Sequence, residues 1–161
     1  MSEITEQIWI GSYGDTSNDI FLKERKITHL LCCAEEIPLR VGFPYYQVYE
    51  GYKIPLIDNE ANEKTKAYFL EGATVLDEWI NTGKNIIVHC FTGISRSVSV
   101  VITYLMVYKG WSYNLAVDHI KLRRPRINLY PDFISILKSI ESKLSPQQAH
   151  YPRPQWDLQV Q

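Results

Sequence analysis

Short apolar runs typical of β-strands alternate along this chain with longer stretches whose apolar residues recur at helical spacing. The strand-like runs are rich in aromatic and β-branched residues and cover residues 7–10, 28–33, 45–49, 53–57 and 86–89. The helix-like stretches cover residues 19–26, 67–80, 97–109, 112–122 and 131–144. This alternation predicts an α/β fold, with a mostly parallel sheet of about five strands and helices on both faces.

The stretch 97–109 is ambiguous between a strand and a helix. Its valines, isoleucine and threonine favour a strand by propensity. However, the run is long for a strand, ends at Gly110 and carries apolar residues on all sides, which suits a buried helix. We therefore expect a central helix here. Ser112 is placed to cap the next helix, and Pro131 to begin the last one.

The length of 161 residues is typical of one domain. We assign residues 1–145 to that domain and residues 146–161 to a polar tail that contains prolines and lies outside the core. A formal net charge of −1 gives no general attraction to nucleic acid or to anionic membranes. No apolar run is long enough to span a bilayer, and the start lacks the pattern of a secretory signal. We expect a monomer with no nucleic-acid partner.

The three cysteines, Cys32, Cys33 and Cys90, are not arranged as disulfide or metal ligands. Cys32 and Cys33 are adjacent in an apolar strand-like run, so we interpret them as small buried residues. A second interpretation makes one of them a resolving thiol for Cys90. Free thiols indicate a reducing compartment, the cytoplasm or the nucleus.

The most informative segment is the loop between the strand 86–89 and the predicted central helix. A strand-to-helix turn directs a row of backbone N–H groups, and the positive end of the helix dipole, at one point. Such a point binds anions. Gly93 lies in the middle of the loop, where the backbone needs a conformation that larger residues resist.

Cys90 begins this loop and Arg96 ends it. A thiol becomes a strong nucleophile when it ionises, and a helix N-terminus with a nearby cation favours the thiolate. The planar guanidinium of Arg96 can hold two oxygens of a phosphoryl group. Thiolate, cation and converging amides together indicate a phosphate pocket whose nucleophile attacks phosphorus.

The pattern His89-Cys90-x-x-Gly93-x-x-Arg96-Ser97 resembles the phosphate-binding loop of the dual-specificity branch of the protein tyrosine phosphatases. The resemblance extends over roughly residues 4–144 and includes similar residues at 8–12, 27–31, 68–69, 104–106 and 124–127. It implies the protein tyrosine phosphatase-like fold. One position departs from the family pattern: Tyr130 stands where the family often has an asparagine that braces the loop, and Asn128 is nearby but out of register.

The resemblance implies a role for each residue of the loop. Cys90 would form a cysteinyl-phosphate that water then hydrolyses, and Ser97 would donate a hydrogen bond to the Cys90 sulfur. His89 would orient the loop from behind and favour the thiolate; alternatively, it is a core histidine without influence. The phosphoryl oxygens would be held by Arg96 and by the loop residues Phe91, Thr92, Gly93, Ile94 and Ser95.

The reaction also needs a carboxylic acid that protonates the leaving oxygen. Asp58 follows the strand-like run 53–57 and opens a polar segment, which resembles the general-acid loop of the family. Glu60 and Glu63 are rivals in the same segment.

The resemblance implies a protein phosphatase that acts on phosphotyrosine and on phosphoserine or phosphothreonine, because a short domain implies a shallow pocket. The loop lacks the lysines common in relatives that hydrolyse phosphoinositides. The alternatives are a phosphatase acting on RNA 5′-triphosphates, glucans or phosphoinositides, and a pseudophosphatase that only binds phosphoproteins. We find no clustered Asp and His ligands for a metal-dependent enzyme and expect no cofactor. Arg123, Arg124 and Arg126 form a small basic cluster, which we interpret as a solvated surface near the site.

Overall fold

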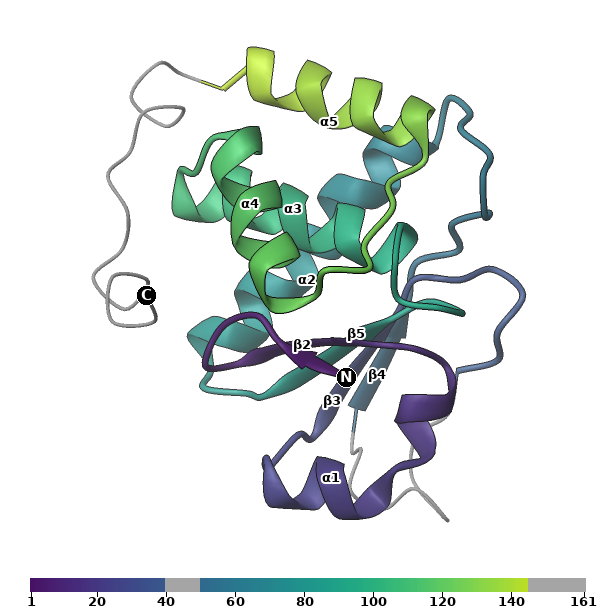
Figure 1. Cartoon of the computed structure of the whole chain (residues 1–161), viewed down its shortest axis with the longest axis vertical. Helices are drawn as coiled ribbons and strands as arrows, with labels where there is room; N and C mark the ends of the chain where they lie inside the picture. The colour runs from purple at the N-terminus through teal and green to yellow at the C-terminus, as the bar shows by residue number, and fades with distance from the viewer. Residues whose placement is uncertain (40–49, 145–161) are drawn as a thin grey trace.

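A single five-stranded sheet lies between helices on its two faces in the computed structural model, which describes residues 1–39 and 50–144 (Figure 1). The strand order is β1-β2-β5-β3-β4. The strands are β1 (Ser2–Glu3), β2 (Ile8–Gly11), β3 (His29–Cys32), β4 (Glu50–Lys53) and β5 (Ile86–His89). Only the pairing of β1 with β2 is antiparallel among these strands. This architecture confirms the predicted α/β class and mostly parallel sheet.

The register of the sheet determines which residues meet at the site. Val88 of β5 pairs with Ile10 of β2 on one side and with Leu31 of β3 on the other. These three strands are parallel, so their carboxyl ends lie at the same edge. The residues that follow them, including Cys33 and Cys90, are therefore neighbours at that edge.

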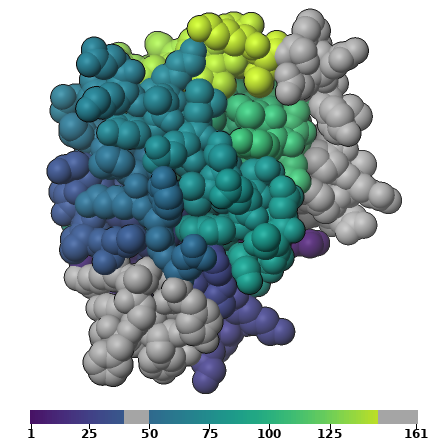
Figure 2. Space-filling model, turned by 180° about the vertical axis from the view of Figure 1, so that it is seen from behind, coloured from purple at the N-terminus to yellow at the C-terminus, as the bar shows by residue number. Residues whose placement is uncertain are grey.

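Helices α2 to α5 cover one face of the sheet, and α1 lies at the other (Figure 1). The helices are α1 (Asp19–Glu24), α2 (Thr65–Asn81), α3 (Arg96–Lys109), α4 (Tyr113–Arg123) and α5 (Pro131–Ser142), with a short 3₁₀ helix, η1 (Gly14–Ser17). Every side chain of α3 from Arg96 to Met106 is buried, and α3 contacts α2, α4, α5 and β5. Seen from behind, α5 lies along one end of the molecule (Figure 2). The central-helix prediction for 97–109 is confirmed, because burial on all sides outweighs the strand propensity of its valines.

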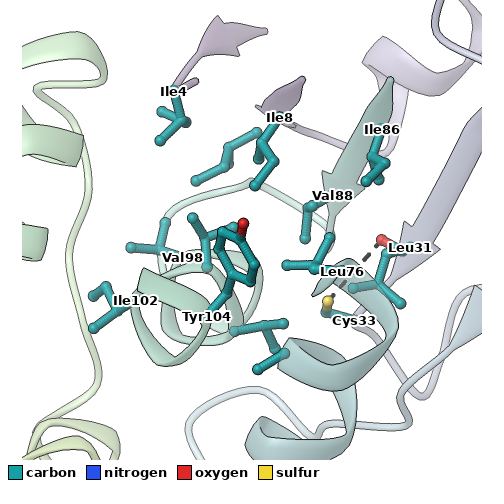
Figure 3. Close-up of a cluster of buried hydrophobic side chains, with 14 of the residues drawn as sticks. Ile4, Ile8, Leu31, Cys33, Leu76, Ile86, Val88, Val98, Ile102 and Tyr104 are labelled. Atoms are coloured by element: carbon teal, nitrogen blue, oxygen red, sulfur yellow. Dashed lines mark hydrogen bonds between the residues drawn. The ribbon is translucent and has the colours of Figure 1, made fainter. Parts of the chain in front are cut away.

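The core lies between the sheet and the helices α2 and α3. Figure 3 shows Ile8, Leu31 and Val88 of the strands facing Leu76 of α2 and Val98 of α3. All five side chains are fully buried. This packing holds the N-terminal end of α3 at a defined height above the sheet, and the loop 90–95 joins the helix at that end.

Three helix boundaries follow the predicted signals. Gly110 adopts φ 72° after α3, a conformation that glycine tolerates best. The Ser112 hydroxyl accepts a hydrogen bond from the Leu115 amide at 3.1 Å, as a capping residue does. Pro131 occupies the first turn of α5.

The strand predicted at 53–57 is wrong, because β4 covers Glu50–Lys53. Pro55 has no N–H to donate to a ladder, and the carbonyl of Leu56 accepts instead from the Glu35 amide and from Arg96. The chain thus turns across the edge of the sheet toward the site. The run 45–49 and the tail 146–161 lie outside the described residues, so those two predictions remain open. None of the helices in the described ranges has the length and hydropathy needed to cross a bilayer.

Candidate active site

The loop between β5 and α3 encloses the thiol of Cys90. Cys90 follows directly after β5, is 2% exposed, and lies six residues before the first residue of α3, Arg96. Gly93 takes φ +72°, and a Cβ atom there would lie 2.6 Å from the Gly11 carbonyl oxygen. The loop therefore requires glycine at this position for both conformation and space.

Hydrogen-bond donors converge on the Cys90 sulfur. The Gly93 amide donates to Sγ at 3.2 Å, and the Ser97 hydroxyl lies 3.3 Å from Sγ. Within residues 1–39 and 50–144, no hydrogen bond engages the amides of Phe91, Thr92, Ile94 and Ser95. Unpaired backbone donors at the start of a helix form a site for an anion. The sulfur thus lies at the base of a cup of main-chain donors.

Arg96 is oriented so that one edge of its guanidinium stays open. Nη1 donates to Glu36 Oε2 at 2.7 Å and to the Leu56 carbonyl at 3.0 Å, and Nη2 donates to Glu36 Oε1 at 2.6 Å. Five N–H bonds are available to an arginine, so one on Nη2 and one on Nε remain. Nε is buried and has no hydrogen-bond partner among the described residues. These two parallel N–H groups form the fork that a phosphoryl group fits.

Glu36 and Arg96 form an ion pair in which each partner favours the charged form of the other. Burial opposes the charged form of Arg96, but the hydrogen bonds to Glu36 and the charges of Cys90, Glu36 and Asp58 together outweigh it, so the pKa of Arg96 is raised. The hydrogen bonds from Arg96 in turn lower the pKa of Glu36. Arg96 is therefore a permanent, fixed cation at the site.

Asp58 lies at the open edge of Arg96. Its Oδ1 is 4.0 Å from Arg96 Nε, and its side chain is 60% exposed. Asn59 follows in a left-handed conformation, φ 52°, which turns the chain immediately after Asp58. The rival Glu60 instead lies near Tyr130, whose pKa is raised by the hydrogen bond to Asp132 and further by the charge of Glu60. Among the three candidate acids, Asp58 is the one that the structure pairs with Arg96.

His89 supports the loop in its neutral form. Burial lowers the pKa of His89 from 6.5 to about 4, so the ring is uncharged at neutral pH. Nδ1 lies 3.0 Å from the Cys90 carbonyl oxygen, and a neutral ring can donate this bond. Tyr13 stacks on the same ring at a centroid distance of 6.3 Å, and its amide donates to the Phe91 carbonyl. His89 can thus orient the loop, but it cannot favour the thiolate through a positive charge.

Two residues at the site were missed by the sequence interpretation. Glu36 follows β3 in the sequence, at the edge where the carboxyl ends of the parallel strands converge. Tyr13 follows β2 at the same edge. Neither residue type nor spacing distinguished them from ordinary loop residues.

Arg124 contradicts the interpretation of a solvated basic cluster. It is 2% exposed, and its guanidinium donates to the carbonyls of Gly93 and Thr92 at 2.7 and 3.2 Å. The sequence suggested a surface because two further arginines flank it. Burial behind the loop became possible because the loop carbonyls supply acceptors for its donors.

Cys33 lies beside Cys90 at the edge of the sheet. The last paired residues are Cys32 and His89, and the Cys33 amide donates to the His89 carbonyl at 2.7 Å. All three cysteines are free and buried, and the burial of Cys32 and Cys33 confirms their interpretation as small core residues. Burial raises the pKa of Cys33 well above its ordinary value, and the nearby Cys90 adds to the rise. The redox role of Cys33 remains a prediction.

Comparison with known proteins identifies a matching family. The model of the dual specificity phosphatase catalytic domain matches residues 8–143. Among curated proteins, the chain is 35% identical over 144 residues to dual specificity protein phosphatase 1B of Arabidopsis thaliana, covering 89% of this chain and 83% of that protein. It is 34% identical over 143 residues to dual specificity protein phosphatase 1 of the same plant, covering 89% and 70%.

Solved structures share the fold. Human tyrosine phosphatase-like serine/threonine/tyrosine-interacting protein superposes with a TM-score of 0.77 at 27% identity, covering 88% of this chain and 95% of that one. Human DUSP28 superposes with a TM-score of 0.78 at 22% identity, covering 88% and 96%. The second similarity shows a common fold alone.

Proposed function

Because this chain belongs to the dual-specificity phosphatase family, we propose that Cys90, Arg96, Asp58 and Ser97 carry out its phosphoester hydrolysis. The chain is a protein phosphatase that hydrolyses phosphotyrosine and phosphoserine or phosphothreonine through a cysteinyl-phosphate. The observation that carries the assignment of residues is the open edge of Arg96 beside the cup that holds the Cys90 sulfur.

In the first step, the Cys90 thiolate attacks phosphorus, an S–P bond forms and the bond to the leaving oxygen breaks. Arg96 Nε and Nη2 hold two phosphoryl oxygens, and the loop amides hold the others as charge spreads over them. Asp58 lies outside the cup, on the exposed side, where the leaving group must depart. It donates its proton to that oxygen.

In the second step, water attacks the phosphorus of the cysteinyl-phosphate and inorganic phosphate leaves. The Asp58 carboxylate accepts a proton from this water, which restores the acid. The S–P bond breaks and its electron pair returns to sulfur. The Ser97 hydroxyl, 3.3 Å from Sγ, donates to the sulfur as the negative charge develops there.

The substrate class implied by the family is a phosphoprotein. The loop side chains support it, because Phe91 is 57% exposed and none of residues 91–95 carries a charge that would bind further phosphates. The expectations of a monomer, of no nucleic-acid partner and of a cytoplasmic or nuclear location remain predictions.

The proposal is tested by steady-state kinetics on aryl phosphates whose leaving groups differ in pKa, under reducing conditions. Cys90→Ser should lose at least about 10³-fold in turnover, because a serine hydroxyl is not ionised at working pH. Asp58→Asn should slow poor leaving groups by about 10²-fold or more and good ones far less. Glu60→Gln and Glu63→Gln are matched controls in the same segment and should retain wild-type rates.

Two results would overturn the assignments. Wild-type turnover by Cys90→Ser would exclude Cys90 as the nucleophile. Equal slowing of all leaving groups by Asp58→Asn, or selective slowing by Glu60→Gln, would exclude Asp58 as the general acid.

A further inference from the structure

Arg124 lies behind the phosphate loop and faces away from the substrate side. It follows α4 directly, and each of its three nitrogens donates a hydrogen bond. Nε donates to the Gly93 carbonyl at 2.7 Å, Nη2 to the Thr92 carbonyl at 3.2 Å and Nη1 to the Ser2 hydroxyl at 2.9 Å. Arginine side chains are rarely buried unless their donors are paired, and here every nitrogen of the guanidinium donates a hydrogen bond.

The two loop carbonyls bound by Arg124 determine the direction of two loop amides. In a trans peptide, the C=O of one residue and the N–H of the next point in opposite directions. The Thr92 carbonyl shares its peptide plane with the Gly93 amide, and the Gly93 carbonyl with the Ile94 amide. When both carbonyls point back toward Arg124, both amides point forward into the cup. The Gly93 amide does so, since it donates to Cys90 Sγ at 3.2 Å.

The guanidinium also adds positive charge near the thiol. Burial lowers the pKa of Arg124 and the nearby Arg126 lowers it further, whereas Asp15 and Cys90 raise it. An arginine nevertheless keeps its proton in proteins. The charge of Arg124 and a thiolate at Cys90 therefore attract each other, and this attraction is additional to that of Arg96.

We propose that Arg124 is a positioning residue of this phosphatase, which directs the amides of Gly93 and Ile94 into the phosphate cup and stabilises the Cys90 thiolate from behind. The inference rests on the proposed function, because it assigns the support of the same site. The role of Arg124 differs from those of Cys90, Arg96 and Asp58 in that Arg124 acts on the loop and on the Cys90 sulfur and does not contact the reacting phosphoryl group.

The connection between α4 and α5 also contacts the loop, through main-chain donors. The Asn128 amide donates to the Ile94 carbonyl at 2.9 Å, and the Tyr130 amide donates to the Ser95 hydroxyl at 3.1 Å. Main-chain groups and Arg124 thus brace the loop together, without an asparagine side chain from position 130. The Tyr130 hydroxyl points elsewhere and donates to Asp132.

The test combines turnover of an aryl phosphate with the pH dependence of Cys90 alkylation by iodoacetamide, followed by peptide mass spectrometry. Arg124→Met should lower kcat/KM by about 100-fold and move the alkylation profile about one unit toward higher pH, because a nearby positive charge is lost. Arg124→Lys keeps the charge without the planar fork. It should keep the alkylation profile near that of the wild type and lower kcat/KM by about tenfold.

Arg126→Met is the matched control, since Arg126 is exposed and makes no hydrogen bond in the described part of the chain. It should retain kcat/KM within about twofold. Arg124→Gln provides a second neutral variant if the methionine variant does not fold, as judged by circular dichroism and thermal unfolding. Wild-type kinetics and a wild-type alkylation profile in folded Arg124→Gln would overturn the inference. An inactive wild-type protein would instead refute the proposed function, and the alkylation profile would still report on Arg124.

Discussion

The substitution Glu36→Gln isolates the contribution of the carboxylate that orients Arg96. In the wild type, both oxygens of Glu36 accept from Arg96, at 2.7 and 2.6 Å, and the guanidinium is 2% exposed. Glutamine is nearly the same size, but its amide nitrogen carries donors and cannot accept from an arginine N–H. The substitution therefore removes one of the two hydrogen bonds and the charge of the other.

The expected effect follows from the burial of the two partners. A hydrogen bond to a charged group contributes about 1.5–3 kcal/mol to stability. Glu36 is 47% exposed, so water can replace part of the lost bond. We therefore expect a net cost of about 1–2 kcal/mol to the orientation of Arg96, which corresponds to about a 5- to 30-fold decrease in kcat/KM.

The measurement is kcat/KM on an aryl phosphate, together with the inhibition constant of inorganic phosphate. In Glu36→Gln, kcat/KM should fall and the inhibition constant of phosphate should rise. The reason is that the open edge of Arg96 holds the phosphoryl group in the ground state and in the transition state. Glu35→Gln is the matched control, because Glu35 is the exposed neighbour and its side chain makes no hydrogen bond among the described residues. If Glu36→Gln matched Glu35→Gln in both measurements, Glu36 would have no role in positioning Arg96.

Two further predictions concern His89 and Cys33. The pKa of His89 is lowered from 6.5 to about 4, so its contribution to stability is complete above pH 6.5 and is lost as the pH falls toward 4, by about 3 kcal/mol in total. Urea unfolding at pH 7.5 and 4.5 should therefore show a steeper loss of stability in the wild type than in His89→Gln, and equal losses would contradict the buried neutral ring. Peroxide should oxidise Cys90 to a sulfenic acid, which condenses with the Cys33 thiol to give a disulfide and water, faster at pH 9 than at pH 7 because Cys33 is protonated at neutral pH. In Cys33→Ser no disulfide can form, so a second peroxide should oxidise the sulfenic acid to a sulfinic acid that thiols do not reduce. Reductant should then restore activity in Cys32→Ser but not in Cys33→Ser, and oxidised protein without a 33–90 disulfide on peptide mapping would exclude this role.

The phosphate loop was accessible from the sequence because its parts are local. Cys90, Gly93 and Arg96 lie within seven residues, and a strand and a helix flank them. Local spacing and the conformational freedom of glycine are enough to predict that such a loop forms a cup. The α/β class was accessible for a similar reason, since periodicity within each element is a local property.

The supporting residues were not accessible, because they depend on contacts across the sheet. Glu36 is 60 residues from Arg96 along the chain, and Arg124 is 31 residues from Gly93. Nothing in the run of arginines around position 124 distinguishes a buried guanidinium from an exposed one. The end of β4 was misplaced for a related reason: the carbonyl of Leu56 is used by Arg96 and Glu35, and not by a neighbouring strand.

The sequence by itself determined the alternation of strands and helices, the single anion-binding loop and the identity of its nucleophile and cation, since each of these is encoded within a few consecutive residues. Only the tertiary structure decided which edge of Arg96 stays open, which acid lies beside it and which buried charge supports the loop from behind. The physical reason is that hydrogen bonds and charges act over a few ångströms in space, and the parallel register brings together residues that are far apart along the chain.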